Sequence, residues 1–248
     1  YTVDSSFSTS EAFAVRDGII LSTGTTNEIQ SAYDAKEMYD AKGLAIYPGF
    51  IDAHCHFLSY GKSLFSVELY GCTSEDEMVE RVKAFAEKNP QEKWIIGRGW
   101  DQNLWPGKQF PTKKKLTELF PDKPVLLERV DGHASLANDA ALTLAHMQPG
   151  MQIAGGSAET KDGKLTGILI DNAIDTLSLV VPKPSKADHE KWLTAAQNNC
   201  FTQGLTTVTD CGLMYNEVES IDALQKENKL QMRIYVMLSD NKLNYDKY

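Results

Sequence analysis

The chain has 248 residues, of which 42% are hydrophobic and 24% are charged, and its formal net charge is -9. This composition is typical of a globular protein with a substantial core, and the negative charge argues against nucleic acid or an anionic membrane surface as the main partner. No apolar run reaches the roughly 18 residues that a membrane helix needs, and no signal peptide is visible. We therefore favour a cytoplasmic location. A periplasmic or secreted one stays open, because the sequence starts at Tyr1 without a methionine.

Residues 12–47 predict a small β unit. The runs 12–16 and 19–22 flank Asp17-Gly18, a dipeptide that favours tight hairpin turns. A further apolar run at 44–47 leads into Pro48-Gly49. We expect these short strands to form the first unit, residues 1–49.

The middle of the chain alternates between strand and helix signals. The run FIDAHCHFL predicts a strand over 50–58. Ser74 and Glu77 have the spacing of a capping box for a helix reaching Phe85, and Thr112 can cap a helix ending near Phe120. Strands are expected over 94–99 and 125–130, a helix over 134–146, and a loop or hairpin over 149–167.

From residue 185 the pattern becomes regular. Ser185 and Asp188 can cap a helix that Gly204 ends. A strand over 205–210, a helix over 216–228 and a strand over 232–238 follow. Helix and strand alternating through short links indicate parallel α/β structure.

The segment Asp52-Ala53-His54-Cys55-His56 carries the clearest chemistry. On a strand, residues two apart point to the same face, so Asp52, His54 and His56 would share one face and Cys55 would point into the core. Two neighbouring imidazoles suit a divalent transition metal, and such an ion lowers the pKa of bound water. From spacing alone, packed histidines without a metal remain the alternative.

Longer runs of the sequence resemble those of a known enzyme superfamily. YPGFIDAHCHF resembles the first barrel strand of the amidohydrolase superfamily. The chain is similar in particular to the amidohydrolase-3 branch, which includes N-substituted formamide deformylase-like enzymes. The other supporting runs are EAFAVRDGIILSTG, WIIGRGWDQNLWP, PVLLERVDGHASLAN, LTGILIDNA and GLTTVTDCG.

The resemblance implies an α/β fold with a partial (β/α)8 TIM barrel. It implies an N-terminal β-sandwich portion over 1–49, the first part of the barrel over 50–248, and a large insertion at about 60–184 after the first barrel strand. It also implies that His54 and His56 bind the metal at the carboxyl end of that strand, where such barrels place their sites. The family's other ligands, a lysine, further histidines and an aspartate, find no match here. We therefore expect an N-terminal part of a longer enzyme, with the catalytic base beyond residue 248 and the chain alone inactive.

Five other residues are candidates, each beside an ordinary structural role. Four of them are candidates for a substrate-pocket role. The structural alternative is helix capping for His133 and core packing for Trp100. It is turn formation for Asp101 and a helix N-cap for Asp171. Asp210 is a candidate for a hydrogen bond to a metal ligand, with capping as its alternative.

The resulting hypothesis is a metal-dependent hydrolase acting on amide-type or formamide-type C–N bonds, other than peptide bonds, of a small molecule. The cofactor would be a divalent metal, zinc above others, with one or two ions. We expect a homo-oligomer or association with the remainder of the same polypeptide, since three strands of a parallel barrel leave an open edge. The alternatives are a non-catalytic binding module with the same fold, or a structural α/β domain with packed histidines.

Overall fold

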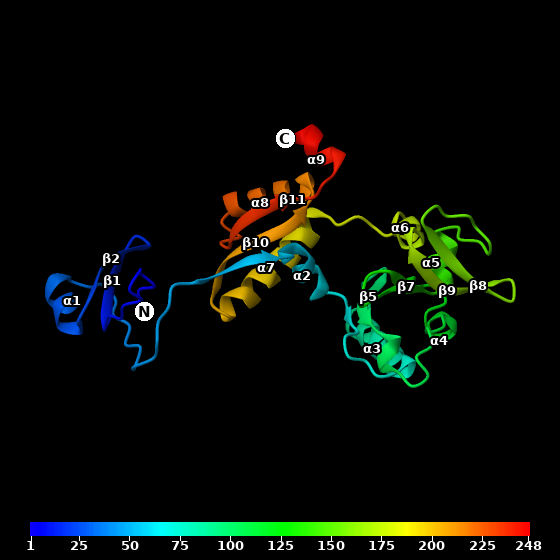
Figure 1. Ribbon diagram of the computed structural model, residues 1–248, viewed down its shortest axis with the longest axis horizontal. Coiled ribbons are helices and arrows are strands. Elements are labelled where there is room, and N and C mark those ends of the chain that lie inside the picture. Colours follow the sequence, from blue (N-terminus) through cyan, green and yellow to red (C-terminus); the bar gives the residue numbers. More distant parts are fainter.

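The computed structural model describes residues 1–248, which form three units arranged in a row (Figure 1). A small N-terminal unit is followed by a central unit, and the central unit is interrupted by an inserted one. The chain passes from the central unit into the inserted one after α2 (Phe57–Ser63) and returns before α7 (Lys186–Thr202).

The N-terminal unit is a two-stranded antiparallel sheet with one helix. β1 (Ala12–Arg16) pairs with β2 (Ile19–Gly24). The predicted turn is confirmed, because Asp17 and Gly18 have φ values of 52° and 76°, the positive values of a type I′ hairpin turn. The prediction of short strands throughout 12–47 is wrong. Thr25 and Glu28 form a capping box that starts α1 (Thr26–Ala32), and the apolar run at 44–47 forms no strand.

The central unit is a parallel sheet of order β11-β10-β3. Its strands are β3 (Phe50–Cys55), β10 (Leu205–Leu213) and β11 (Arg233–Leu238). Apolar side chains of α2, α7 and α8 (Tyr215–Lys226) pack with β10 into one core, and α9 (Lys242–Lys247) follows β11. The predicted alternation after residue 185 is confirmed, including the Ser185–Asp188 capping box and a positive φ of 77° at Gly204.

Strand β3 is shorter than predicted. It ends at Cys55, and α2 begins at Phe57. Phe57 and Leu58 are both buried in the central core. Consecutive strand residues point to opposite faces, so a strand would have buried only one of them. The helical turn allows both to be buried.

The inserted unit is a six-stranded mixed sheet of order β4-β5-β6-β7-β9-β8. Its strands are β4 (Val67–Glu68), β5 (Ile95–Trp100), β6 (Val125–Arg129), β7 (Ala134–Ala137), β8 (Gly156–Lys161) and β9 (Lys164–Asp171). Its helices are α3 (Glu75–Lys88), α4 (Lys114–Leu119), α5 (Asp139–Leu144) and α6 (Asn172–Ser178), with a 3-10 turn over Gln102–Leu104. Two separate cores, one with residues of α3 and α4 and one with residues of α5 and α6, enclose the sheet. Of the loop or hairpin predicted over 149–167, the structure has the hairpin, formed by β8 and β9, although β9 continues to Asp171.

Three predictions in the inserted unit need correction. Ser74 caps α3 as expected, but the Glu77 carboxylate accepts from Thr73 and not from the N-cap backbone, so the capping box is incomplete. Residues 134–137 form strand β7, because that segment pairs with both β6 and β9, and the helix starts only after the Asn138 cap. Thr112 does not cap α4. Its backbone N–H and hydroxyl both donate to Glu75 instead.

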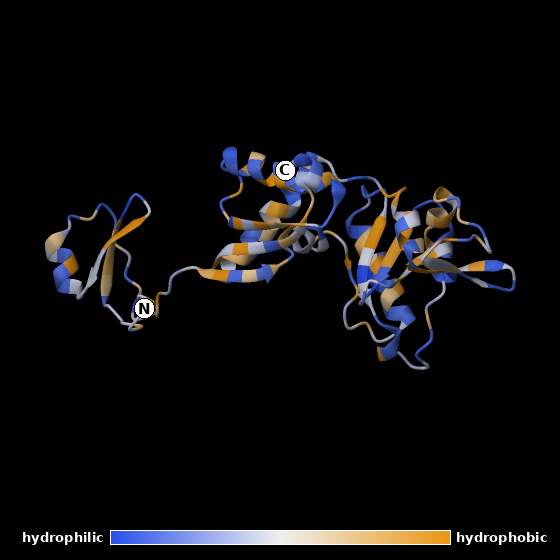
Figure 2. Ribbon diagram, turned by 45° about the horizontal axis from the view of Figure 1, so that its top comes forward, coloured by the Kyte–Doolittle hydropathy of each residue, from blue (hydrophilic) through white to orange (hydrophobic).

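One face of the central sheet is uncovered. Ile51, Tyr235 and Met237 are at least half exposed. On this face the Met237 sulfur lies 3.6 Å from that of the half-buried Cys211 on the neighbouring strand β10. Apolar segments are also visible on the N-terminal hairpin (orange in Figure 2). Among the helices, none combines the length and the apolar character that crossing a bilayer requires.

Candidate functional site

His54 and His56 are neighbours at the carboxyl end of β3. His54 lies on the strand, and His56 is the N-cap residue of α2. Their ring centroids are 5.9 Å apart and the ring planes are nearly perpendicular, at 87°. Two imidazoles that bind one tetrahedral zinc ion through nitrogens at 2.0–2.1 Å have centroids about 5.2 Å apart, and about 6.4 Å is the limit for rings on opposite sides of the ion. The separation of this pair lies between these two values.

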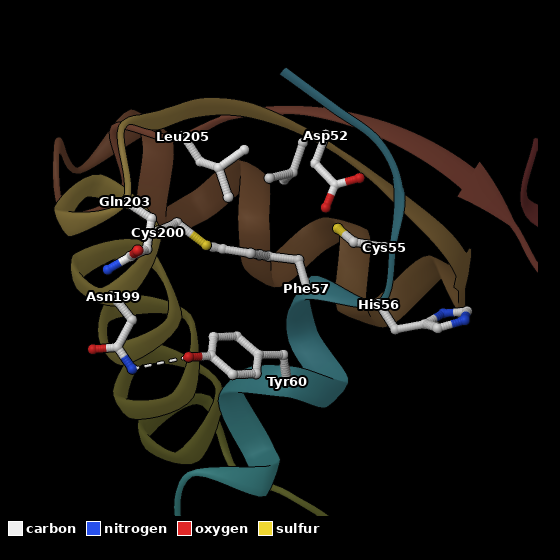
Figure 3. A pocket seen from close by; sticks show the side chains of 10 residues that line it. Asp52, Cys55, His56, Phe57, Tyr60, Asn199, Cys200, Gln203 and Leu205 are labelled. Atoms are coloured by element: carbon white, nitrogen blue, oxygen red, sulfur yellow. Dashed lines mark hydrogen bonds between the residues drawn. The ribbon is translucent and has the colours of Figure 1, made fainter. Parts of the chain in front are cut away.

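The prediction that Asp52 shares one face with His54 and His56 is wrong, because an irregularity in the pairing of β3 with β10 places Asp52 beside Cys55. The Asp52 carboxylate accepts a hydrogen bond of 3.0 Å from the backbone N–H of His54. Asp52 and Cys55 both line a cavity of about 250 Å³ beside α7. His56 also borders this cavity, but Figure 3 shows its ring directed away from Asp52 and Cys55. Burial, with the nearby Asp210 and Asp52 carboxylates, raises the pKa of the Cys55 thiol to about 12, so this thiol stays protonated at neutral pH.

A second cavity is better placed for chemistry. It measures about 150 Å³ and lies where β3 and β10 end. In parallel α/β structures, ligands bind at the carboxyl ends of the strands. The first cavity is larger but lies between β3 and α7. The second brings His56 together with three ionisable side chains, Lys62, Asp210 and Glu217, and with the Ser59 hydroxyl. The sequence pattern did not single out Lys62 or Glu217, because only the turn of α2 and the packing of α8 bring them there.

Asp210 links β10 to the start of α2. Its carboxylate accepts a 2.9 Å hydrogen bond from the backbone N–H of Leu58, 152 positions away in the chain. His56 itself makes no side-chain capping bond, so Asp210 supplies the acceptor that a helix N-terminus needs. Asp210 is only 2% exposed, and burial raises the pKa of its carboxyl group. Asp210 therefore caps α2, as its structural alternative predicted, and the residue that it caps, Leu58, is two positions after His56.

Asp210→Ala is expected to lower the free energy of unfolding by about 1–3 kcal/mol, because buried N–H groups at the start of α2 lose their acceptor. Asp210→Asn keeps an acceptor oxygen and should lose less than half as much. Urea denaturation measures both changes. The matched control is Asp222→Ala, which removes an exposed pair with Lys226 worth no more than about 0.5 kcal/mol. Equal losses in the alanine and asparagine variants would contradict the capping role.

Trp100 and Asp101 have the contacts expected for their structural roles, core packing and turn formation. Trp100 is fully buried in the first core of the inserted unit, and its indole N–H donates to the backbone carbonyl of Leu127 at 2.8 Å. Asp101 caps the 3-10 turn by accepting from the backbone N–H of Asn103. Neither side chain lines one of the two cavities described above.

His133 and Asp171 come together although 38 positions separate them. The Nδ1 atom of His133 lies 2.8 Å from Oδ1 of Asp171, and both side chains are exposed to a large extent. Asp171 precedes α6 but makes no side-chain capping bond. The hydrogen bond to Asp171 raises the pKa of the His133 imidazole, with further contributions from the charges of Asp171 and Asp131. The sequence pattern offered the two residues as separate candidates. The pairing of β7 with β9 brings them into contact.

The chain matches the model of the amidohydrolase family over residues 37–246. It is 35% identical over 210 residues to YtcJ of Bacillus subtilis, a protein named as an amidohydrolase, covering 83% of this chain and 40% of the relative. It is 31% identical over 185 residues to the N-substituted formamide deformylase of Arthrobacter pascens, covering 71% of this chain and 33% of the enzyme. The chain belongs to the amidohydrolase family.

A solved structure shows the same fold. The crystal structure of an uncharacterized metal-dependent hydrolase from Pyrococcus furiosus superimposes with a TM-score of 0.68 at 25% identity. The match covers 90% of this chain and 45% of that structure. The chain thus spans less than half the length of the relatives described here, and it has the mixed α/β fold found in part of a metal-dependent hydrolase.

Proposed function

We propose that this chain provides the first metal ligands of a hydrolase that cleaves C–N bonds other than peptide bonds in a small molecule. The observation that supports this most is the His54–His56 pair at the carboxyl end of the first parallel strand, in a chain of the amidohydrolase family. The name of one relative, N-substituted formamide deformylase, favours formamides and related amides as substrates.

The residues present meet some of the requirements of a divalent-metal site. Imidazole nitrogen is a good ligand for zinc, and the ring separation of 5.9 Å is within about 1 Å of the value for two ligands of one tetrahedral ion. However, no group of three or more histidine, cysteine, aspartate or glutamate side chains lies close enough to hold an ion, whereas a catalytic zinc normally has three protein ligands. We therefore propose that the remaining ligands and the catalytic base come from residues beyond these 248, around one or two zinc ions.

A bound ion would supply the activation of water and the polarisation of the carbonyl group. This chain's own residues would hold His56 in place through the Asp210 cap and would line the cavity where β3 and β10 end. Lys62 and Glu217, which also line that cavity, are the charged groups available to contact a substrate there.

We also propose that β3, β10 and β11 are the first three strands of a (β/α)8 barrel and that residues 1–49 are part of a β-sandwich. The uncovered face of the central sheet and the exposed apolar side chains of the N-terminal hairpin support both proposals. The inserted unit accounts for the interruption between the first two barrel strands. Either another copy of the chain or more of the same polypeptide would cover the exposed surface.

A zinc titration of the 248-residue chain tests the ligand count. Losing even an outer-shell partner of a metal ligand costs about 10–100-fold in affinity, so two ligands alone should bind zinc at least that much more weakly than a complete site. Calorimetry should show weak binding that a mild chelator removes and that His54→Ala abolishes. Tight, stoichiometric binding would mean that the missing ligands are already among these residues.

A further inference from the structure

Asp171 has an unusual backbone conformation at the end of β9. Its φ and ψ are 47° and -123°, a region that favours glycine and strains other residues. The chain has no freedom to relax there. The backbone N–H of Asp171 donates to the carbonyl oxygen of His133 at 3.1 Å, and the residue pairs with Gly156 of β8, where an added Cβ would lie 2.5 Å from a backbone nitrogen.

Stability does not account for an aspartate at this position, because a glycine would make the same backbone contacts without the strain. The strained residue makes no cap for the helix that follows it. Its side chain instead holds His133, whose own side chain is 75% exposed, and exposed ion pairs contribute little to stability. A strained residue kept for a contact with so little stabilising effect points to a functional constraint.

The surrounding contacts fix His133 and leave one ring atom available. The backbone N–H of His133 donates to Asp131, which is paired with Arg129 at 2.9 Å. Nδ1 is engaged by Asp171 at 2.8 Å, whereas Nε2 has no hydrogen bond. A carboxylate on Nδ1 selects the tautomer with the proton there, and Nε2 is then a hydrogen-bond acceptor.

We propose that Asp171 is a positioning residue that holds His133 as the Nδ1–H tautomer, so that Nε2 accepts a hydrogen bond from the N–H of a small amide. The choice of an amide rests on the proposed function. His133 is therefore a substrate-binding residue on the inserted sheet, separate from the His54–His56 pair on β3.

The charges around His133 set the pH range of this binding. Asp171 and Asp131 raise the pKa of the imidazole, and Arg129 opposes them. Protonation of Nε2 removes the acceptor, so amide binding should weaken as the pH falls through the raised pKa. The effect on stability has the opposite sign, because the Asp171 contact favours the protonated ring. That contribution is complete below the unfolded pKa of about 6.5 and is lost as the pH rises through the folded pKa.

Nitrogen-15 NMR of the 248-residue chain tests the proposal, with N-benzylformamide as the probe and no zinc present. In the unmodified chain, neutral His133 should be the Nδ1–H tautomer with a pKa above the ordinary value. Asp171→Asn keeps an acceptor, so the tautomer should persist while the pKa falls. Asp171→Gly suits the positive φ, so the chain should stay folded with an unchanged or higher Tm while the tautomer preference is lost.

Binding of the probe completes the test. Asp171→Gly and His133→Gln should each weaken it about 10-fold, the effect of one hydrogen bond, whereas the control Asp139→Asn should leave it unchanged. An Nε2–H tautomer in the unmodified chain, no binding of the probe, or equal binding by Asp171→Gly would overturn the proposal. Because no zinc is present, a separate failure of zinc-dependent hydrolysis, or hydrolysis indifferent to His54→Ala, would count against the proposed function alone.

Discussion

His54→Ala is expected to lower both the zinc affinity and the amide hydrolysis of the protein that carries this chain by at least about 100-fold. Outer-shell changes already reduce metal affinity by about 10–100-fold, and this substitution removes a ligand itself. His54 lines neither cavity and is exposed, so its loss should leave the folded structure intact. Competition with a chelator for zinc, and formamide hydrolysis at limiting zinc, measure the two effects.

The matched control is His146→Asn. His146 is exposed and has a φ of 52°, a conformation that asparagine tolerates well. This variant should keep its zinc and its activity. If His54→Ala also kept both, the proposed metal site on β3 would be refuted. If the two histidine variants lost zinc equally, the metal would be bound nonspecifically.

Trp100→Ala is expected to destabilise the inserted unit by about 3–5 kcal/mol, the usual cost of removing a large buried aromatic side chain. Trp100 has no exposed surface and packs against Trp105 and Phe110, with ring centroids 6.1 and 6.0 Å away. Trp100→Phe preserves most of this packing but leaves the Leu127 carbonyl without its donor, which should cost about 1–3 kcal/mol. Urea denaturation followed by circular dichroism distinguishes the two variants.

The control for this comparison is Leu104→Ala, four residues further along and 57% exposed, which should change stability by less than about 0.5 kcal/mol. A substrate-pocket role for Trp100 makes a different prediction. In that case Trp100→Ala would keep the unfolding midpoint of the unmodified chain and instead weaken the binding of N-benzylformamide.

Turns, caps and regular alternation were predictable because short segments determine them. Asp17-Gly18 adopts the hairpin turn that its residue types favour, and Ser185 with Asp188 caps α7 as its spacing predicts. The i, i+2 spacing of His54 and His56 likewise predicts two neighbouring imidazoles, and their rings do lie close together. In each case the interacting groups lie within four residues, so local geometry is sufficient.

Only the tertiary structure decided which residues cooperate over long distances. Residues 134–137 became a strand because β6 and β9 lie on either side of them, although the sequence pattern suggested a helix. The same sheet brought His133 to Asp171, and the parallel pairing of β10 with β3 brought Asp210 to the start of α2. Sequence spacing carries no information about partners 38 or 152 positions apart, because strand order and register, set by burial of the cores, determine where they meet.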